Sequence, residues 1–128
     1  MKYEVCFYQN GEKDIVVNVI EGSAQEITCN GSRMTKIEPN TSEGAQEKHL
    51  PVVEQQGNEV TVKVGDIFHP MQEDHSIQWV YLQSQKGCQM KFLSPGGEPV
   101  ATFQLCGQDT PVAAYAYCNL HGFWKTQL

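Results

Sequence analysis

Four histidines and one cysteine occur in three short clusters of this sequence, and their side chains could bind a metal ion. The clusters are Glu47-Lys48-His49-Leu50-Pro51, His69-Pro70-Met71-Gln72-Glu73-Asp74-His75 and Cys118-Asn119-Leu120-His121-Gly122, and they contain every histidine of the chain. Neutral imidazole and thiolate are good ligands for iron, copper and zinc, whereas magnesium and calcium prefer carboxylates. The three clusters together predict one transition-metal site with five protein ligands.

Each cluster also has a turn-forming residue beside its histidine, namely Pro51, Pro70 and Gly122. Proline fixes the backbone and glycine permits tight turns, so ligands from different strands can be directed to one point. The Cys118-x-x-His121 step that ends at Gly122 resembles a metal knuckle. In such a knuckle, backbone N–H groups donate hydrogen bonds to the thiolate sulfur.

Taken one at a time, these residues have simpler interpretations. A single histidine is usually a surface or core residue, and Cys118 could be a small buried apolar side chain. Glu47 and Lys48 could be ordinary solvated charges of a loop. The presence of all four histidines in the three clusters favours the metal site over these alternatives.

Short strands must carry the clusters, because runs of alternating apolar and polar residues recur between turn formers and helical periodicity is nearly absent. Residues 52–56 and 60–64 flank Gly57-Asn58, which is typical of a hairpin. Further strands are expected at residues 75–82, 89–93, 100–105 and 112–118. This series predicts an all-β chain with an immunoglobulin-like β-sandwich.

The first 37 residues are expected to form a separate small β domain, with strands near residues 2–7, 14–20 and 25–28. Residues 38–44 are polar and rich in turn formers, so the domain of residues 38–128 is expected to begin there. About 37 residues are too few for an independent core without a metal or a partner surface. We therefore expect this domain to pack on the main domain or on a second subunit.

Composition excludes several function classes. The chain has 128 residues, a formal net charge of −6 and only 9 Lys and Arg residues without a basic run, so no nucleic-acid partner is expected. It has no apolar stretch long enough to span a membrane and no apolar signal-peptide run near Met1, so a cytoplasmic location is expected. The odd number of five cysteines is a poor disulfide framework, and Cys88 and Cys106 are expected to be buried thiols.

Three segments resemble the signature segments of a known family, the superoxide reductases, which include the desulfoferrodoxins and neelaredoxins. The segments are EKHLP, HPMQEDHSIQW and AYAYCNLHGFW, in order over roughly residues 45–125. The resemblance implies an immunoglobulin-like sandwich and one mononuclear iron per chain that alternates between Fe2+ and Fe3+. It also implies a thiolate on the axis and four equatorial imidazoles, from Cys118 and from His49, His69, His75 and His121, respectively.

The same resemblance implies a reaction, the one-electron reduction of superoxide to hydrogen peroxide in defence against oxidative stress. In the family, the lysine at the position of Lys48 assists protonation of the product through water. The glutamate at the position of Glu47 can occupy the open site of the oxidised resting state. A rubredoxin-like electron donor and a homodimer are further expectations from the family.

The chain departs from this family at its N-terminal end. Desulfoferrodoxins begin with a small domain in which a C-x-x-C pair and a later adjacent pair of cysteines hold a second iron. Here Cys6 and Cys29 remain, while Gln9 and Asn30 occupy the other expected positions. The first domain is therefore expected to be desulforedoxin-like without a complete iron site; a site bridging two subunits through Cys6 and Cys29 of each is the alternative.

Three other functions remain open from the sequence. A non-catalytic zinc module would prefer four closed ligands, whereas this sequence offers five. A small electron-transfer protein resembling a cupredoxin would need a cysteine–histidine–methionine loop spacing that is absent. A dismutase would form one peroxide from two superoxide ions, whereas a reductase forms one from each.

Overall fold

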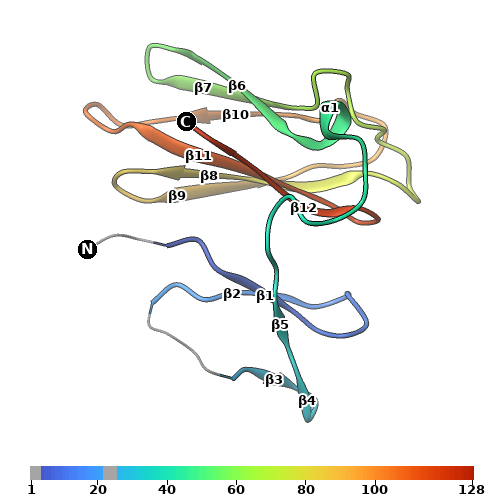
Figure 1. Cartoon of the computed structure of the whole chain (residues 1–128). Helices are drawn as coiled ribbons and strands as arrows, with labels where there is room; N and C mark the ends of the chain where they lie inside the picture. Colours follow the sequence, from blue (N-terminus) through green and yellow to red (C-terminus); the bar gives the residue numbers. More distant parts are fainter. Residues whose placement is uncertain (1–3, 22–25) are drawn as a thin grey trace. The chain divides into compact units, whose positions relative to one another are not determined.

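The computed structural model describes residues 4–21 and 26–128 (Figure 1). The chain divides into two compact units, Met1–Glu38 and Pro39–Leu128. Strands make up 48% of the described residues and helix 3%, so the all-β prediction is confirmed. The expected strands near residues 2–7 and 25–28 lie partly outside the described residues.

The first unit contains short antiparallel strands. Three of them form a sheet in the order β2-β1-β5, and two others form a hairpin. The bounds are β1 Phe7–Gln9, β2 Val16–Asn18, β3 Thr28–Cys29, β4 Ser32–Arg33 and β5 Thr35–Lys36.

Two local features explain the turns of this unit. Asn30 and Gly31, between β3 and β4, both have positive φ angles, 52° and 81°, as a two-residue hairpin turn requires. The Asn10 side chain accepts hydrogen bonds from the amides of Asp14 and Ile15 and so closes the turn between β1 and β2.

The second unit is a sandwich of two antiparallel sheets, which confirms the predicted sandwich (Figure 1). One sheet has the order β10-β7-β6 and the other β12-β11-β8-β9. The elements are α1 Gln46–His49, β6 Pro51–Gln56, β7 Glu59–Val64, β8 Ile77–Ser84, β9 Cys88–Phe92, β10 Val100–Gln104, β11 Pro111–Cys118 and β12 Gly122–Gln127.

Alternation along the strands builds the core between the two sheets. Val60, Val62 and Val64 of β7 are fully buried, whereas Thr61 and Lys63 between them are less buried, because successive side chains of a strand point to opposite faces. Buried residues of β8, β10 and β11 complete the same cluster, namely Val80, Leu82, Ala101, Phe103, Ala114, Ala116 and Cys118. One end of this core therefore includes a residue of the predicted metal site.

The Asp109 carboxylate accepts hydrogen bonds from two turns at the C-terminal end of β8. Ser84 Oγ donates to Asp109 Oδ2 at 2.7 Å, and the amides of Lys86 and Thr110 donate to Oδ1 at 3.1 and 2.8 Å. These hydrogen bonds, that from Ser84 foremost, hold the pKa of Asp109 below its ordinary value. These hydrogen bonds join the two turns at the end of the sandwich away from the predicted site.

The expectation that Cys88 and Cys106 are buried is wrong, because both thiols are exposed. Cys88 begins β9, an edge strand whose five residues are all exposed, and Cys106 follows β10. An edge strand has a neighbour on one side only, so its side chains gain less burial than those of a central strand. Within residues 4–21 and 26–128, no helix has the length and hydropathy needed to cross a membrane.

Truncation of a core residue should show how strongly this sandwich depends on its packing. We expect Phe103→Ala to lower the free energy of unfolding of the metal-free protein by about 3–5 kcal/mol, because Phe103 is fully buried. Urea denaturation followed by tryptophan fluorescence measures the change. The matched control is Phe92→Ala, since Phe92 is 78% exposed and should cost less than about 0.5 kcal/mol. Equal losses in the two variants would contradict the assigned core.

Candidate metal centre

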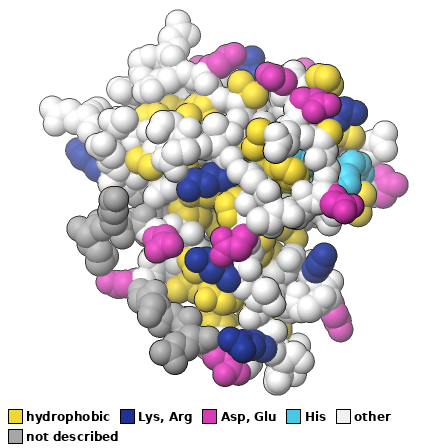
Figure 2. All heavy atoms as spheres, in the orientation of Figure 1, with side chains coloured by type: hydrophobic (Ala, Val, Ile, Leu, Met, Phe, Trp, Pro, Cys, Tyr) yellow, Lys and Arg dark blue, Asp and Glu magenta, His cyan; other side chains and the backbone are white. Residues whose placement is uncertain are grey.

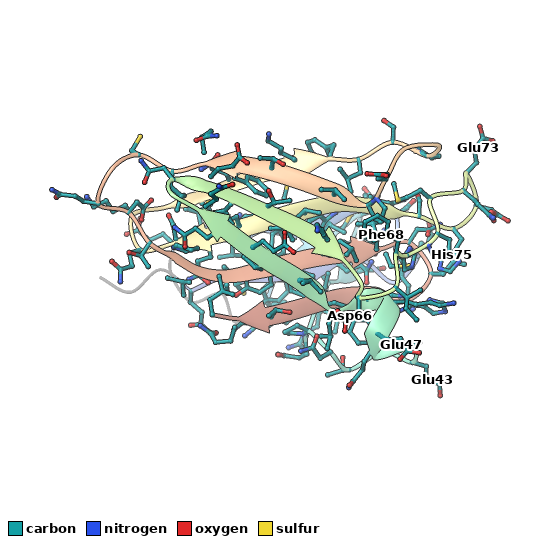
Figure 3. The ribbon with its side chains drawn as sticks, turned by 90° about the horizontal axis from the view of Figure 1, so that it is seen from above. Glu43, Glu47, Asp66, Phe68, Glu73 and His75 are labelled. Carbon is teal, nitrogen blue, oxygen red and sulfur yellow. The ribbon has the colours of Figure 1, made fainter. Side chains whose placement is uncertain are left out.

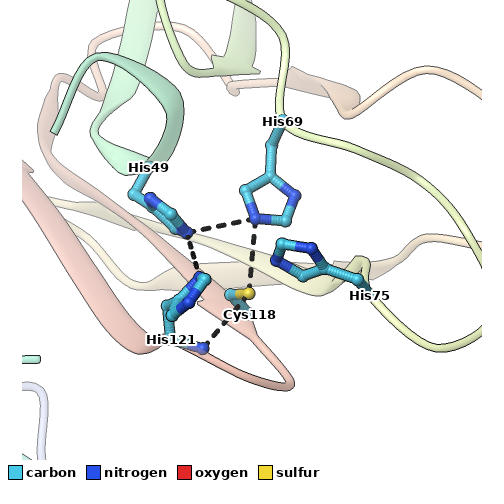
Figure 4. A group of neighbouring side chains, drawn as sticks. All are labelled: His49, His69, His75, Cys118 and His121. Carbon is cyan, nitrogen blue, oxygen red and sulfur yellow. Dashed lines mark hydrogen bonds between the residues drawn. The ribbon is translucent and has the colours of Figure 1, made fainter. Parts of the chain in front are cut away.

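The structure brings all five predicted ligands together at one end of the sandwich (Figure 4). One donor atom from each lies within 4.8 Å of all the others. Five separate positions supply them: the end of α1, the loop after β7, the segment before β8, the end of β11 and the turn before β12. In that order the residues are His49, His69, His75, Cys118 and His121.

The four imidazole rings form a closed square in the order His49, His69, His75, His121. Neighbouring ring centroids are 4.6 Å apart for His49–His69 and His69–His75, 5.1 Å for His75–His121 and 4.9 Å for His121–His49. Each neighbouring pair meets edge to face, with interplanar angles between 71° and 86°. Such an arrangement turns the edges of the rings, rather than their faces, toward a common centre.

Hydrogen bonds on the outside of the square determine which ring nitrogens face inward. His49 Nδ1 lies 2.7 Å from the Ala45 carbonyl oxygen, and His69 Nδ1 lies 2.7 Å from the Pro70 carbonyl oxygen. A carbonyl oxygen only accepts, so each Nδ1 must carry the ring proton. In the neutral rings, the Nε2 lone pairs of His49 and His69 therefore face each other across 3.1 Å.

Further donor atoms lie close to these two nitrogens. His49 Nε2 lies 3.1 Å from His121 Nδ1, and the Cys118 sulfur lies 3.3 Å from His69 Nε2. His75 Nε2 is buried and has no hydrogen-bond partner among the described residues. Buried lone pairs directed at one another repel unless a cation lies between them. The donor set thus fits a bound metal ion.

The distances between these donor atoms indicate which angle between metal–ligand bonds they would suit. With bond lengths of about 2.1 Å to nitrogen and about 2.3 Å to sulfur, ligands at 90° are separated by about 3.0 Å for two nitrogens and about 3.1 Å for nitrogen and sulfur. Tetrahedral angles would separate them by about 3.4 and 3.6 Å. The observed 3.1 and 3.3 Å are closer to the right-angled set, so a metal held by these donors would have room for a further ligand.

Burial sets the protonation of the ligands before any metal binds. It lowers the pKa of His69 to about 4 and also lowers the pKa of His49, so both imidazoles are neutral at pH 7 and able to coordinate. Burial raises the pKa of the Cys118 thiol, against hydrogen bonds from the amides of His121 and Leu120. The His121 amide nitrogen lies 3.4 Å from the sulfur, which is the contact expected of a metal knuckle.

Residues outside the predicted set hold the rings in place. Trp124 stacks on His49 with ring centroids 4.8 Å apart, and its indole N–H donates to the His121 carbonyl at 3.0 Å. Nothing in the sequence indicated that Trp124 belongs to the site, because an apolar strand residue carries no signal beyond core packing. Trp124 thus packs against the ring of His49 and also holds the backbone of the turn that carries His121.

Two glycines let the segment before α1 lie against the rings. A Cβ atom on Gly44 would be 3.1 Å from His49 Cε1 and 3.4 Å from His121 Cβ. A Cβ atom on Gly122, whose φ angle is 76°, would be 2.7 Å from Ser42 Oγ. Side chains at these positions would therefore push the segment away from the centre.

Backbone contacts also fix the turn that carries the two predicted catalytic residues. The Ile67 amide donates to the Glu47 carbonyl at 3.1 Å, and the Gly65 amide donates to the Leu50 carbonyl at 3.1 Å. Both Glu47 and Lys48 have exposed side chains, and Glu47 lies at the same end of the sandwich as His75 (Figure 3). The charged pair is thus presented to solvent beside His49.

An asparagine joins the two segments that carry the remaining ligands. Asn119 Oδ1 accepts from the Ser76 amide at 3.0 Å, and its Nδ2 donates to the Asp74 carbonyl at 2.9 Å. The turn between Cys118 and His121 is thereby held against the segment of His75. Asn119 was visible in the sequence beside Cys118, but nothing in its spacing indicated this role.

Comparisons with known proteins agree with this geometry. Residues 41–127 match the family model described as Desulfoferrodoxin. A desulfoferrodoxin of Clostridium acetobutylicum is 36% identical over 128 residues, which covers all of both chains. One of Nitratidesulfovibrio vulgaris is 41% identical over 112 residues, covering 88% of this chain and 87% of the relative.

Comparison with solved structures agrees with the match to the family model. The superoxide reductase from Treponema pallidum matches with a TM-score of 0.84 at 38% identity, covering 99% of this chain and 100% of the other. A superoxide reductase from Giardia intestinalis matches with a TM-score of 0.55 at 34% identity, covering 64% of this chain and 97% of the other. Sequence, fold and full-length coverage thus agree, and the chain belongs to the desulfoferrodoxin family.

Proposed function

We propose that this protein is a superoxide reductase with one iron ion held by His49, His69, His75, His121 and Cys118. The observation that carries the proposal is the square of imidazoles whose inward nitrogens, together with one thiol sulfur, lie at right-angled spacing. The structural relatives named superoxide reductase support the same reaction.

The proposed reaction consumes one superoxide ion, one electron and two protons and yields one hydrogen peroxide. An iron ion held by these five residues would supply the one-electron chemistry, because iron can alternate between Fe2+ and Fe3+. Zinc has no redox chemistry and prefers four ligands, so a purely structural zinc site agrees less well with the five donors. An external reductant must restore the electron after each turnover.

Cys118 is the residue proposed to adjust the electronics of the site. Its sulfur is fully buried at the end of the core, where a thiolate is stabilised by a metal rather than by water. The thiolate donates charge toward the metal, and the hydrogen bond from the His121 amide limits that donation. Cys118 is the last residue of β11 and belongs to the hydrophobic core, which would hold this ligand in place.

Lys48 is proposed to attract the anionic substrate and to pass protons to the product through water. At about 6 Å a unit charge contributes roughly 0.7 kcal/mol in water and about 2.8 kcal/mol at an effective dielectric of 20. Charges farther than about 8–10 Å are largely screened by salt. The neighbouring Glu47 carboxylate is proposed to occupy the open position in the oxidised resting state.

We further propose a rubredoxin-like electron donor, a homodimer and a cytoplasmic location. The first unit is proposed to be a desulforedoxin-like domain without a complete iron site, since its Cys6 and Cys29 supply only two thiols. The alternative for this unit is a site that bridges two subunits through Cys6 and Cys29 of each.

Product stoichiometry tests the reaction. Iron-loaded protein supplied with a reductant should form one hydrogen peroxide for each superoxide consumed. Pulse radiolysis with a peroxide assay, normalised to iron per chain, measures the ratio, and metal-free protein is the control. A ratio of one peroxide for two superoxide ions would identify a dismutase, and no acceleration over the control would leave a non-catalytic metal module.

Removal of the thiolate tests the ligand assignment. Cys118→Ser should abolish the visible thiolate-to-iron band of the oxidised protein and reduce the iron bound per chain, because serine does not provide a thiolate. Optical spectra and metal analysis of protein from iron-supplemented cells measure both. Cys106→Ser, an exposed thiol in the loop after β10, is the matched control and should keep the band. An unchanged band in Cys118→Ser would exclude the axial assignment.

Removal of the local positive charge tests the role of Lys48. Lys48→Ala should slow the second-order reaction with superoxide at low ionic strength by at least about threefold while the iron content stays the same. Pulse radiolysis at several salt concentrations measures the rate.

Two variants separate this effect from general charge changes. Lys86→Ala changes the net charge equally at the turn held by Asp109 and should leave the rate unaltered. Glu47→Ala should change the oxidised spectrum without slowing the first encounter. An unchanged rate in Lys48→Ala at low ionic strength would refute the attraction of substrate by this residue.

A further inference from the structure

Asn119 lies where β11 leaves its sheet to form the turn between Cys118 and His121. Cys118 and Ile77 are the last residues of β11 and β8 that are paired in register. One further contact continues this ladder, since the Asn119 amide donates to the Ser76 carbonyl at 3.3 Å. Beyond this point the main chain of β11 turns away, so the backbone before Ile77 needs other hydrogen-bond partners.

The Asn119 side chain supplies those partners. In a regular antiparallel ladder, the Ser76 amide would donate to the Asn119 carbonyl, and the Asp74 carbonyl would accept from the His121 amide. Here Asn119 Oδ1 accepts from the Ser76 amide at 3.0 Å instead. Asn119 Nδ2 donates to the Asp74 carbonyl at 2.9 Å. The carboxamide thus takes the place of two main-chain groups of a continuing strand.

This replacement leaves the His121 amide for the metal centre. The His121 amide nitrogen lies 3.4 Å from the Cys118 sulfur, whereas a continuing ladder would direct it to the Asp74 carbonyl. One side chain therefore allows the knuckle to form and still provides hydrogen bonds for the segment of His75.

The His75 ring is oriented differently from two of the other imidazoles. The rings of His49 and His69 are each fixed by a carbonyl oxygen 2.7 Å from Nδ1. The His75 ring forms no hydrogen bond with any described residue, and its Nε2 is buried without a partner. Apart from edge-to-face contacts with its neighbouring rings, its position depends on the backbone that carries it.

Two sets of hydrogen bonds hold that backbone. The His75 amide and carbonyl exchange hydrogen bonds with Gln72 at 3.2 and 2.9 Å, which closes a tight turn. Asn119 contacts the residues on both sides of His75, which are Asp74 and Ser76. The turn is closed on itself, so Asn119 attaches it to the end of β11.

Loss of this attachment would affect the more open side of the metal centre. His49 and His69 are 3% and 2% exposed, whereas His75 and His121 are only partly buried. Figure 2 shows histidine atoms at the surface of the face drawn. An imidazole on a detached turn could therefore move into solvent. Three imidazoles and one thiolate would remain, and four ligands are the number that zinc prefers.

We propose that Asn119 is a positioning residue that keeps His75 among the metal ligands and thereby favours ions with more than four ligands over zinc. The inference rests on the five-ligand centre of the proposed function and adds the side chain that completes it. Asn119 acts through its hydrogen bonds to the backbone on both sides of His75.

A double-mutant cycle with His75 tests the proposal. The metal-free full chain with reduced thiols is titrated with Co2+ and with Zn2+ against a competing chelator. The four proteins are the wild type, Asn119→Ala, His75→Ala and the double variant. Four-coordinate Co2+ absorbs visible light more strongly than six-coordinate Co2+, so the spectrum reports the number of ligands.

Asn119→Ala should weaken Co2+ binding by about 10–100-fold, as for other residues that orient a ligand, and should increase the visible absorption. Zn2+ binding should weaken less, because zinc retains four ligands. In the His75→Ala background, Asn119→Ala should change Co2+ binding by no more than about twofold. Unchanged Co2+ binding in Asn119→Ala, a loss of equal size in both backgrounds, or equal losses for the two ions would overturn the proposal.

Two further variants complete the test. Asn119→Asp keeps an acceptor for the Ser76 amide but lacks the donor to the Asp74 carbonyl. It should show a smaller loss with the same dependence on His75, and it replaces Asn119→Ala in the cycle if that variant does not fold. The matched control is Asn58→Ala, at an exposed position in the turn between β6 and β7, which should bind both ions like the wild type.

The Co2+ spectrum of the wild type distinguishes this failure from a failure of the proposed metal centre. A strongly absorbing, four-coordinate wild-type form would refute the five-ligand centre and the role of Asn119 with it. A weakly absorbing wild-type form with unchanged binding in Asn119→Ala would refute the role of Asn119 alone. Superoxide reduction is measured separately on the iron-loaded wild type, so its absence would refute the reaction and leave the role of Asn119 intact.

Discussion

The repulsion among inward-facing donor atoms is the constraint on which the rest of the structure depends. The Ala45 and Pro70 carbonyls hold the ring protons of His49 and His69 on the outer nitrogens, so lone pairs meet at 3.1 Å inside. The His75 nitrogen and the Cys118 sulfur add to this buried cluster. A cation at the centre converts these repulsions into bonds, so metal binding and the folding of this end of the sandwich stabilise each other.

The five ligand residues lie on structural elements of different kinds. Cys118 ends a central strand and belongs to the hydrophobic core, whereas the histidines lie on a short helix, loops and a turn. Those looser segments are fixed by Trp124, by Asn119 and by the close approach of Gly44 to two rings. All five donors are thus held in place by contacts outside the donor set.

Electrostatics at this end combine two opposing effects. In the proposed reaction Lys48 would favour a small anion at short range, whereas exposed carboxylates on the same segments, such as Glu43 and Glu73, would disfavour it. Because salt screens charges farther than about 8–10 Å, the charge nearest the site would dominate the approach of the anion.

The sequence by itself determined the β class, the sandwich and the group of residues around the metal, because period-two alternation and the grouping of histidines with a cysteine are local patterns. It could not determine that Cys88 and Cys106 are exposed, since edge and central strands have similar sequences. Only the tertiary structure decided which ring nitrogens face inward and how Trp124 and Gly44 support the rings. Those properties depend on contacts between residues far apart in the chain, and no local pattern encodes them.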